Sequence, residues 1–342
     1  MSDLSAARDA IAAAVQTHAP GAEVTGIKPL VGGACQDNVR VDLLIDGEPS
    51  RLVVRSDAAS GIPGTIDRAR EYNVMQAAAA AGVQTPGVHW LTEGLLRPGA
   101  WAYFMDWSDG VAIGRQVLKT PELAGARAGL AAELAGQAAR IHAITPESSI
   151  GKSITALDAP EDSDAIAHGI RLTREMINQL DAPTPATELI FRWMVENPPP
   201  TRDVVLSHGD FRIGNFMVTP NGLANVLDWE FARWSSPYDD LAWVSVRDWR
   251  FNRIHKPIGG FSGRAPFYAA YEEASGRAVN LQDVHWWEIN GNLRWGLGCA
   301  FQAQRYAAGQ KDLELIAIGR RAAEMEYEAL RLIETGVAGL GA

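Results

Sequence analysis

Cysteines, long apolar runs and an excess of basic residues are all missing from this chain of 342 residues. Its two cysteines, Cys35 and Cys299, are too few for a disulfide framework, which favours a reducing compartment. The longest stretch without a charged residue, 73–92, is interrupted by Gly82 and Pro86 and has only a weakly apolar polyalanine core, so it does not fit a membrane span. Charged residues also interrupt the N-terminal segment. We therefore expect no signal peptide and a cytoplasmic protein.

The charge balance and the composition exclude further classes. Asp and Glu outnumber Lys and Arg by 41 to 31, which gives a formal net charge of −10, whereas a dedicated nucleic-acid binder is usually basic. With 47% hydrophobic and 21% charged residues, the chain is neither disordered nor fibrous. At about 100–200 residues per domain, its length allows two or three folding units. We expect a globular protein that binds neither nucleic acid nor a membrane, and the sequence does not predict its oligomeric state.

The first third of the chain has the pattern of a small α+β lobe. Apolar and polar residues alternate over 39–43, Asp46-Gly47 is a strong hairpin signal, and 52–54 reads as the returning strand. Helices are predicted over 3–17 and 65–81, and a further strand over 102–105. We therefore predict an N-terminal lobe over residues 1–107, in which residues 1–20 form a leading helix.

Residues 108–342 are predicted to form a larger, mainly helical lobe. Apolar residues repeat at helical spacing from Leu123 to Ile141, and again from Leu315 to Leu332, which predicts one long last helix. Residues 145–163 read as a loop. One β-rich island interrupts the helices, with a strand at 204–206 and a hairpin whose strands cover 216–218 and 224–227.

The chemistry-bearing residues gather in this island, over 206–242. Asp210 follows the first strand, Asn215 comes just before the hairpin, and Asp228 lies where the hairpin ends. Two carboxylates and an amide at strand ends can converge on one point, and Mg²⁺ prefers such oxygen ligands together with substrate phosphates. This spacing is also the layout of a kinase catalytic loop followed by a metal-binding Asp.

The same block resembles the aminoglycoside phosphotransferase-like (APH) family of small-molecule kinases, with matches at 208–212, Asn215, 228–230 and 240–242. The similarity extends in order over roughly residues 25–310, and the branch it resembles most includes kinase-like domains fused to acyl-CoA dehydrogenases. The resemblance implies a bilobal, protein-kinase-like fold and an ATP- and Mg²⁺-dependent enzyme. Its substrate would be a small molecule that carries a hydroxyl group.

The resemblance also implies a role for each residue of the block. Asp210 would be the catalytic Asp that accepts or orients the hydroxyl proton, while Asn215 and Asp228 would hold the metal ions. His208 is expected to brace the loop, and Asp240 to cap a helix or anchor the loop. For Arg212 and Glu230 two interpretations stay open, which are a local ion pair and contact with the substrate.

In the N-terminal lobe the implied nucleotide site is less regular. Arg55 stands where a kinase has its phosphate-contacting Lys, with Glu71 as its partner; Arg can grip phosphate in a bidentate manner. Gly32 and Gly33 lie where a phosphate-covering loop belongs, although an ordinary turn is the alternative. Residues 105–107 would be the hinge beside adenine, with Met105 and Trp107 as nucleotide-binding residues and Phe104 as a further pocket wall.

The sequence gives less direct evidence on the phosphoryl acceptor than on the nucleotide site. The segment 247–264 is locally basic, so Arg250 and Arg253 are candidates to bind an anionic acceptor such as a hydroxyacyl-CoA, although a solvated loop is the alternative. An aminoglycoside or other antibiotic kinase would need carboxylates there instead. A nucleotide-binding pseudokinase without turnover is a third possibility. A protein kinase is disfavoured, because little room remains for an activation loop between Asp228 and Asp240.

Overall fold

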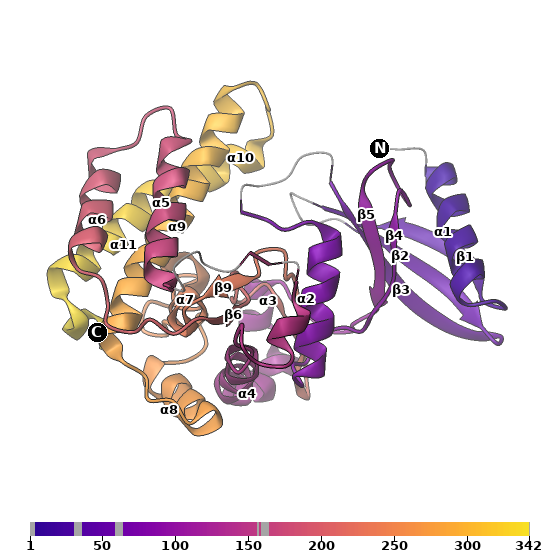
Figure 1. Ribbon diagram of the computed structural model, residues 1–342, viewed down its shortest axis with the longest axis horizontal. Helices are drawn as coiled ribbons and strands as arrows, with labels where there is room; N and C mark the ends of the chain where they lie inside the picture. Colours follow the sequence, from indigo (N-terminus) through magenta and orange to yellow (C-terminus); the bar gives the residue numbers. More distant parts are fainter. Residues whose placement is uncertain (1–3, 31–35, 59–63, 156, 159–163, 342) are drawn as a thin grey trace.

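The N-terminal lobe is built on one antiparallel sheet (Figure 1). The computed structural model describes residues 4–30, 36–58, 64–155, 157–158 and 164–341. The strands are β1 (Glu23–Pro29), β2 (Gln36–Ile45), β3 (Glu48–Asp57), β4 (Val88–Glu93) and β5 (Trp101–Asp106). They pair in the order β1-β2-β3-β5-β4, and the predicted hairpin joins β2 to β3. The β-rich character of this lobe is confirmed.

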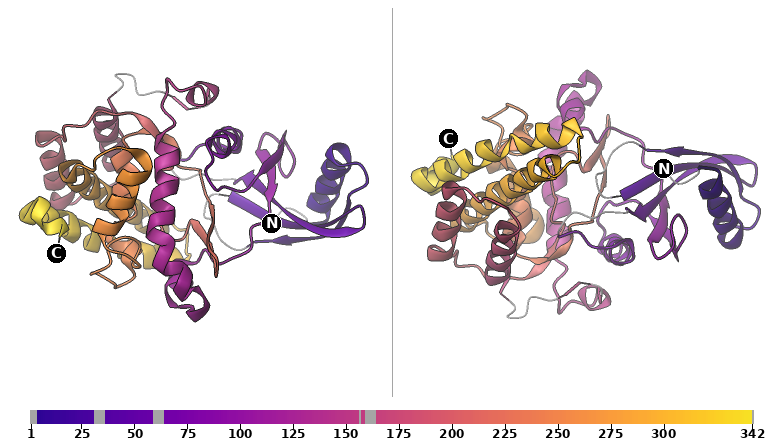
Figure 2. Two further views of the ribbon diagram at one scale, coloured as in Figure 1. Left: turned by 90° about the horizontal axis from the view of Figure 1, so that it is seen from below. Right: turned by 90° about the horizontal axis from the view of Figure 1, so that it is seen from above.

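Two helices cover the sheet. The leading helix α1 (Leu4–His18) packs at the end of the molecule farthest from the helical lobe, and its Ile11 and Val15 are buried in one apolar cluster with β2 and β3 (Figures 1 and 2). Helix α2 (Arg68–Ala80) lies on the other side, and its Val74 belongs to the core of the helical lobe. Because strand residues alternate between faces, Tyr103 joins this second cluster.

The same alternation corrects one sequence prediction. Phe104 belongs to the cluster on the α1 side and contacts the Trp90 ring edge-on, with the ring centroids 5.1 Å apart. It is fully buried on the face of the sheet opposite to Tyr103, so it is a core residue and no wall of a nucleotide pocket.

The C-terminal lobe is mainly helical, as predicted. Its helices are α3 (Gly114–Lys119), α4 (Ala124–His142), α5 (Ala165–Asn178), α6 (Pro185–Glu196), α7 (Pro237–Trp243), α8 (Arg264–Ser275), α9 (Leu281–Ala307), α10 (Leu313–Gly319) and α11 (Ala322–Thr335). The prediction of one long last helix was wrong, since α10 ends at Gly319. A Cβ at that glycine would lie 2.6 Å from the Cβ of Ala303 on α9, so close packing against α9 requires glycine where the helix ends. In the described part of the chain, no helix combines the length and apolarity needed to cross a bilayer.

The β island supplies the loops of the helical lobe that face the sheet. β6 (Val205–Ser207) pairs with β9 (Arg233–Ser235), and β7 (Phe216–Thr219) pairs with β8 (Gly222–Val226) as the predicted hairpin. The strands are short, and the connections between them carry Asp210, Asn215 and Asp228. In all three ribbon views these segments lie on the side of the helical lobe nearest the sheet (Figures 1 and 2).

Candidate active site

A cleft of about 850 Å³ lies between the two lobes and is lined from both sides. The helical lobe contributes Asp210, Asn215 and Asp228, and the sheet contributes Arg55 and Met105. Leu30, Asn38, Val53, Glu71, Tyr103, Trp107, Arg212 and Glu230 also line it. The fold therefore brings most of the predicted site residues to one cavity. Gly32 and Gly33 lie outside the described residues.

The loop that carries Asp210 is fixed by a buried carboxylate. Asp240 accepts the backbone N–H of His208 at 2.7 Å and that of Gly209 at 2.9 Å. Burial alone would raise the pKa of Asp240, but hydrogen bonds from His142 and His208 outweigh it and lower the pKa to about 2. Asp240 is thus the loop anchor, one of its two predicted roles; the other is wrong, because Ser236 caps α7.

Two further residues hold the same loop. Gly209 has a φ of +78°, and a Cβ there would lie 2.1 Å from the backbone oxygen of Phe231, so only glycine fits. His208 bridges the segments that carry Asp210 and Asp228: its Nδ1 accepts from the backbone N–H of Asp210 at 3.2 Å, and its Nε2 donates to the carbonyl of Leu227 at 2.9 Å. Burial lowers the pKa of His208, so the neutral ring with this tautomer is favoured.

Both carboxylate oxygens of Asp210 are held by side chains. Trp243 donates its Nε1–H to Oδ1 at 2.7 Å, Arg212 donates its Nε–H at 2.9 Å, and Asn215 donates from Nδ2 to Oδ2 at 2.6 Å. Asp210 is mostly buried, yet it lines the cleft. Sequence reasoning missed Trp243, because the indole reaches Asp210 from α7 and no local spacing signals that contact.

Asn215 and Asp228 present oxygen atoms to the cleft. The amide nitrogen of Asn215 is committed to Asp210, and among the described residues no hydrogen bond to its Oδ1 is found. Asp228 has a φ of +68°, a left-handed conformation that Asp tolerates better than most residues, and its side chain keeps 26% exposure. An amide oxygen and a carboxylate that line one cavity are donors of the kind that Mg²⁺ takes in proteins.

Arg55 links the sheet, α2 and Asp228. It binds Glu71 in a bidentate manner, with both N···O distances at 2.9 Å, and its Nη2 also pairs with Asp228. Burial alone would lower the pKa of Arg55, but Glu71 and Asp228 hold it well above its ordinary value. Its Nη1 takes part in none of these bonds. The guanidinium is therefore charged and fixed at the wall of the cleft.

Glu71 is completely buried, and its carboxylate has three partners, which are two arginines and one tyrosine hydroxyl. Besides Arg55, it pairs with Arg68 at 2.7 Å and accepts a hydrogen bond from the Tyr103 hydroxyl at 2.9 Å. Arg68 also pairs with Glu230 at 3.4 Å, which agrees with the ion-pair interpretation of Glu230. Burial and the nearby Asp228 raise the pKa of Glu230 to about 7. The predicted Arg55–Glu71 pair is therefore the centre of a larger network.

Arg250 and Arg253 lie elsewhere. Neither lines the cleft. Arg250 is buried and pairs with Glu288 at 2.7 Å and with Glu328 at 3.3 Å, while Arg253 donates to the carbonyl of Leu118. This placement corrects the interpretation of 247–264 as an acceptor site. At Arg250 the segment 247–264 is neither a binding surface nor a solvated loop. The charge of Arg250 is neutralised by Glu288 on α9 and Glu328 on α11.

Glu288 is expected to be a strong contributor to stability. It is fully buried and accepts hydrogen bonds from Arg264 and Arg250. Glu288→Gln therefore removes the negative charge that both buried guanidinium groups contact. We expect the free energy of unfolding in urea to fall by about 3 kcal/mol. The matched control is Glu188→Gln, which breaks the exposed Arg174–Glu188 pair and should cost less than about 1 kcal/mol. Equal losses in the two variants would contradict a stabilising role for the buried cluster.

Comparisons with known proteins identify the family and the fold of this chain. The model of the phosphotransferase enzyme family (APH) matches residues 26–286. Acyl-CoA dehydrogenase family member 10 of Mus musculus is 28% identical over 182 residues, which are 51% of this chain and only 16% of that much longer relative. The resemblance to the branch of kinase-like domains related to acyl-CoA dehydrogenases is thereby confirmed.

Solved structures share the fold. A protein from Ralstonia eutropha, described as a candidate aminoglycoside phosphotransferase, superposes with a TM-score of 0.73 at 20% identity and covers 96% of this chain and 98% of its own. The GDP complex of aminoglycoside 2'-phosphotransferase-IIIa has a TM-score of 0.58 at 16% identity and covers 94% and 98%. The bilobal kinase-like architecture is confirmed by these likenesses. From the family match over most of its length, this chain belongs to the phosphotransferase enzyme family.

Proposed function

We propose that this chain is an ATP- and Mg²⁺-dependent kinase that transfers the γ-phosphoryl group of ATP to a hydroxyl group of a small molecule. One observation carries the proposal. Asp210, Asn215 and Asp228 of the helical lobe line a single cleft together with the Arg55–Glu71 pair, which is far from them along the chain. A phosphoryl group positioned among these side chains would face an acceptor in the remaining part of the cleft.

Asp210 is proposed to orient the acceptor hydroxyl and to take its proton as the new P–O bond forms, while the bond between the γ-phosphorus and the bridging oxygen breaks and ADP leaves. Trp243, Arg212 and Asn215 hold the carboxylate in one orientation. Phosphoryl transfer passes through a loose transition state, so positioning of the hydroxyl contributes more than strong basicity. Trp243 and Arg212 act as positioning residues, because they hold the carboxylate that would contact the hydroxyl.

Asn215 and Asp228 are proposed to hold Mg²⁺ through their side-chain oxygens, as the donor set described above allows. When bound, the ion would neutralise charge on the transferring phosphates. Arg55 is proposed to contact a phosphate through Nη1, while Glu71 fixes its direction. The nucleotide base is proposed to lie between Leu30, Val53 and Met105, which line the cleft on the sheet side, with Trp107 at the edge.

The acceptor is proposed to be a hydroxylated acyl compound, for which a hydroxyacyl-CoA is a candidate. The support is the similarity to a relative named for acyl-CoA chemistry and a cleft with many apolar side chains. The alternative of an antibiotic kinase is favoured by the structural similarity to aminoglycoside enzymes. However, Asp210 and Asp239 of the acceptor side are already paired with arginines, so neither charge is free to attract a polycation.

Binding of Mg²⁺ and ATP is the first expected result. ATP with Mg²⁺ should raise the melting temperature, because a ligand at 100 times its dissociation constant stabilises the folded state by about 2.7 kcal/mol. ATP with EDTA serves as the control and should give a smaller shift. The measurement is differential scanning fluorimetry at millimolar nucleotide. The same melting temperature with and without Mg²⁺ and ATP would count against a nucleotide site in this cleft.

A further inference from the structure

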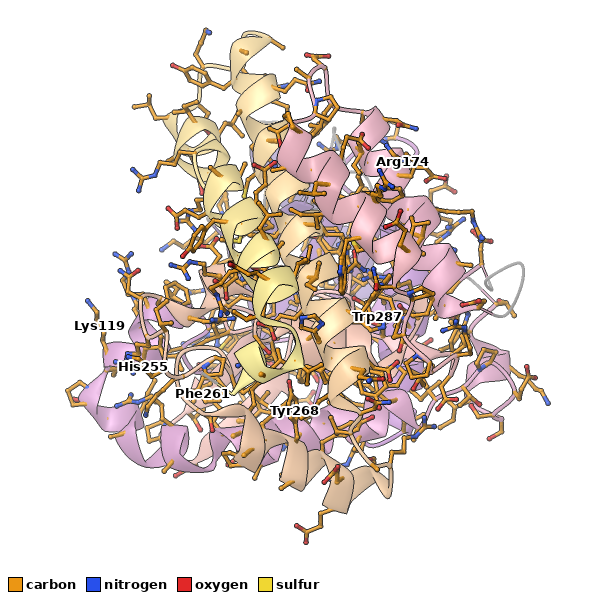
Figure 3. All side chains as sticks on the ribbon, turned by 90° about the vertical axis from the view of Figure 1, so that its left-hand side faces the viewer. Lys119, Arg174, His255, Phe261, Tyr268 and Trp287 are labelled. Atoms are coloured by element: carbon orange, nitrogen blue, oxygen red, sulfur yellow. The ribbon has the colours of Figure 1, made fainter. Side chains whose placement is uncertain are left out.

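The part of the cleft beyond Asp210 lies between helices α5, α9 and α10. Its walls are largely apolar, with Leu172 and Met176 from α5, Leu297 and Phe301 from α9 and Ile318 from α10. Trp287, on the same helix α9, is buried inside the helical lobe (Figure 3) and also lines the cleft. Glu175, Gln179 and Gln302 also line the cleft, but the apolar side chains of this part suit an aliphatic chain.

One cluster in this region carries an excess of positive charge. Asp239 accepts hydrogen bonds from Arg233 at 2.5 Å and from Arg294 at 2.8 Å, so two guanidiniums share one carboxylate. All three residues line the cleft. Among the described residues, Arg294 has no other salt bridge, and its Nη2 and Nε make no hydrogen bond. The burial of Arg294 and the nearby charge of Arg233 lower its pKa to about 10, as expected of an incompletely neutralised cation.

Arg294 lies close to the catalytic loop. Its guanidinium stacks over the Trp243 ring, 4.8 Å from the centroid, and the same indole donates its Nε1–H to Asp210. A group bound to Arg294 would therefore be separated from Asp210 by little more than one side chain. Guanidinium groups bind oxygen atoms of carboxylates in a bidentate manner, which would fix the orientation of an acceptor.

A second unsatisfied donor lies on the same helix. The Nε1–H of Trp287 is buried and has no hydrogen-bond partner, although Trp287 lines the cleft. Buried polar groups are usually paired, so a lone donor at the wall of a binding cavity indicates an acceptor atom that the ligand supplies. Trp287 and Arg294 are seven residues apart on α9, which places them on one face of the helix.

We infer that Arg294, assisted by Trp287, binds the oxygen atoms of an acyl group, either a carboxylate or the carbonyl of its thioester. The inference rests on the proposed function and narrows its acceptor to an aliphatic hydroxy acid or its acyl derivative, with the hydroxyl a few carbons from the acyl carbon. Arg294 is then a specificity-determining residue, and a cationic amino alcohol is rejected by the local excess of positive charge.

The test uses three probes with the same chain and the same hydroxyl group. They are β-hydroxydecanoate, the diol in which an alcohol replaces its carboxylate, and the amino alcohol in which an amine replaces it. For each probe, phosphoryl transfer is measured with Mg²⁺ and ATP by mass spectrometry, and binding is measured by the shift in melting temperature. The enzymes are the wild type, Arg294→Met, Arg294→Lys, and Arg174→Met as the control. Arg174 lies on α5 at the surface, where it pairs with Glu188 (Figure 3).

In the wild type we expect the carboxylate probe to have the lowest KM. Arg294→Met should raise that KM about 10- to 100-fold, the effect of losing a hydrogen bond to a charged group, with little change for the diol. Arg294→Lys should recover part of the preference, and Arg174→Met should behave as the wild type. Asp239 keeps its bonds from Arg233 and Ser235 in these variants, so folding is expected.

Two outcomes overturn the inference. One is that the wild type prefers the amino alcohol. The other is that Arg294→Met raises KM equally for the carboxylate probe and the diol, which would place Arg294 beside the transferred phosphoryl group. Failure of the proposed function is distinguishable from both. If no probe is phosphorylated but β-hydroxydecanoate raises the melting temperature of the wild type and not of Arg294→Met, the acyl site stands while the transfer reaction does not.

Discussion

Asp210→Asn is expected to lower kcat for phosphoryl transfer by about a thousandfold while ATP still binds. Loss of a general base typically reduces the rate by about 10²–10⁴-fold. The amide can neither take the hydroxyl proton nor accept from all of Trp243, Arg212 and Asn215, since one of its two heteroatoms is itself a donor. The measurement combines steady-state kinetics with the shift in melting temperature caused by Mg²⁺ and ATP.

The control for this variant is Asp203→Asn. Asp203 is exposed and pairs with Arg277 at the surface, so the same change of charge is made far from the cleft. Its turnover should match that of the wild type. If Asp210→Asn kept full turnover, Asp210 would not be the residue that receives the hydroxyl proton. If it lost nucleotide binding together with activity, the defect would lie in folding of the loop.

Asp228→Asn is expected to remove most of the effect of Mg²⁺ on ATP binding and to lower kcat about a thousandfold. A metal ion contributes several kcal/mol to stabilising the transferring charge, and about 1.4 kcal/mol corresponds to a factor of ten. Asn tolerates the left-handed backbone at this position, so the change removes charge without forcing the chain to move. The measurement is the affinity for ATP by calorimetry, with and without Mg²⁺.

Asp46→Asn provides a matched control. Asp46 also has a left-handed backbone, with a φ of +53°, but it lies in the exposed turn between β2 and β3. It should leave both the Mg²⁺ dependence and kcat unchanged. An Asp228→Asn variant that binds ATP with the same Mg²⁺ dependence as the wild type would remove Asp228 from the metal site and leave Asn215 without its proposed partner.

The local parts of the fold and site could be predicted because short sequence patterns determine them. The hairpin between β2 and β3 follows from a period of two and an Asp-Gly turn. The motif residues Asp210, Asn215 and Asp228 flank short strands within one β island, so their common placement depends on a few turns. The pairing of Arg55 with Glu71 was predicted from the family resemblance, which places a cation on this strand and its partner Glu on the next helix.

The parts that failed depend on contacts between distant segments. The charge of Arg250 was read as a binding surface, but its partners Glu288 and Glu328 lie on other helices, and no pattern in 247–264 reports them. Likewise, Trp243 reaches Asp210 from α7, and Tyr103 reaches Glu71 across the N-terminal lobe. A sequence shows which side chains are charged, whereas only tertiary packing decides whether that charge is buried and paired.

The account is tested most directly by incubating the wild type with Mg²⁺, ATP and a panel of hydroxylated acyl compounds, amino alcohols and aminoglycosides. Mass spectrometry then detects the gain of one phosphoryl group. We predict a phosphorylated acyl compound in the wild type and none with Asp210→Asn. If the wild type binds Mg²⁺ and ATP through Asp228 yet phosphorylates no compound and forms no ADP, the protein is a pseudokinase and the proposed catalytic role of the cleft is wrong.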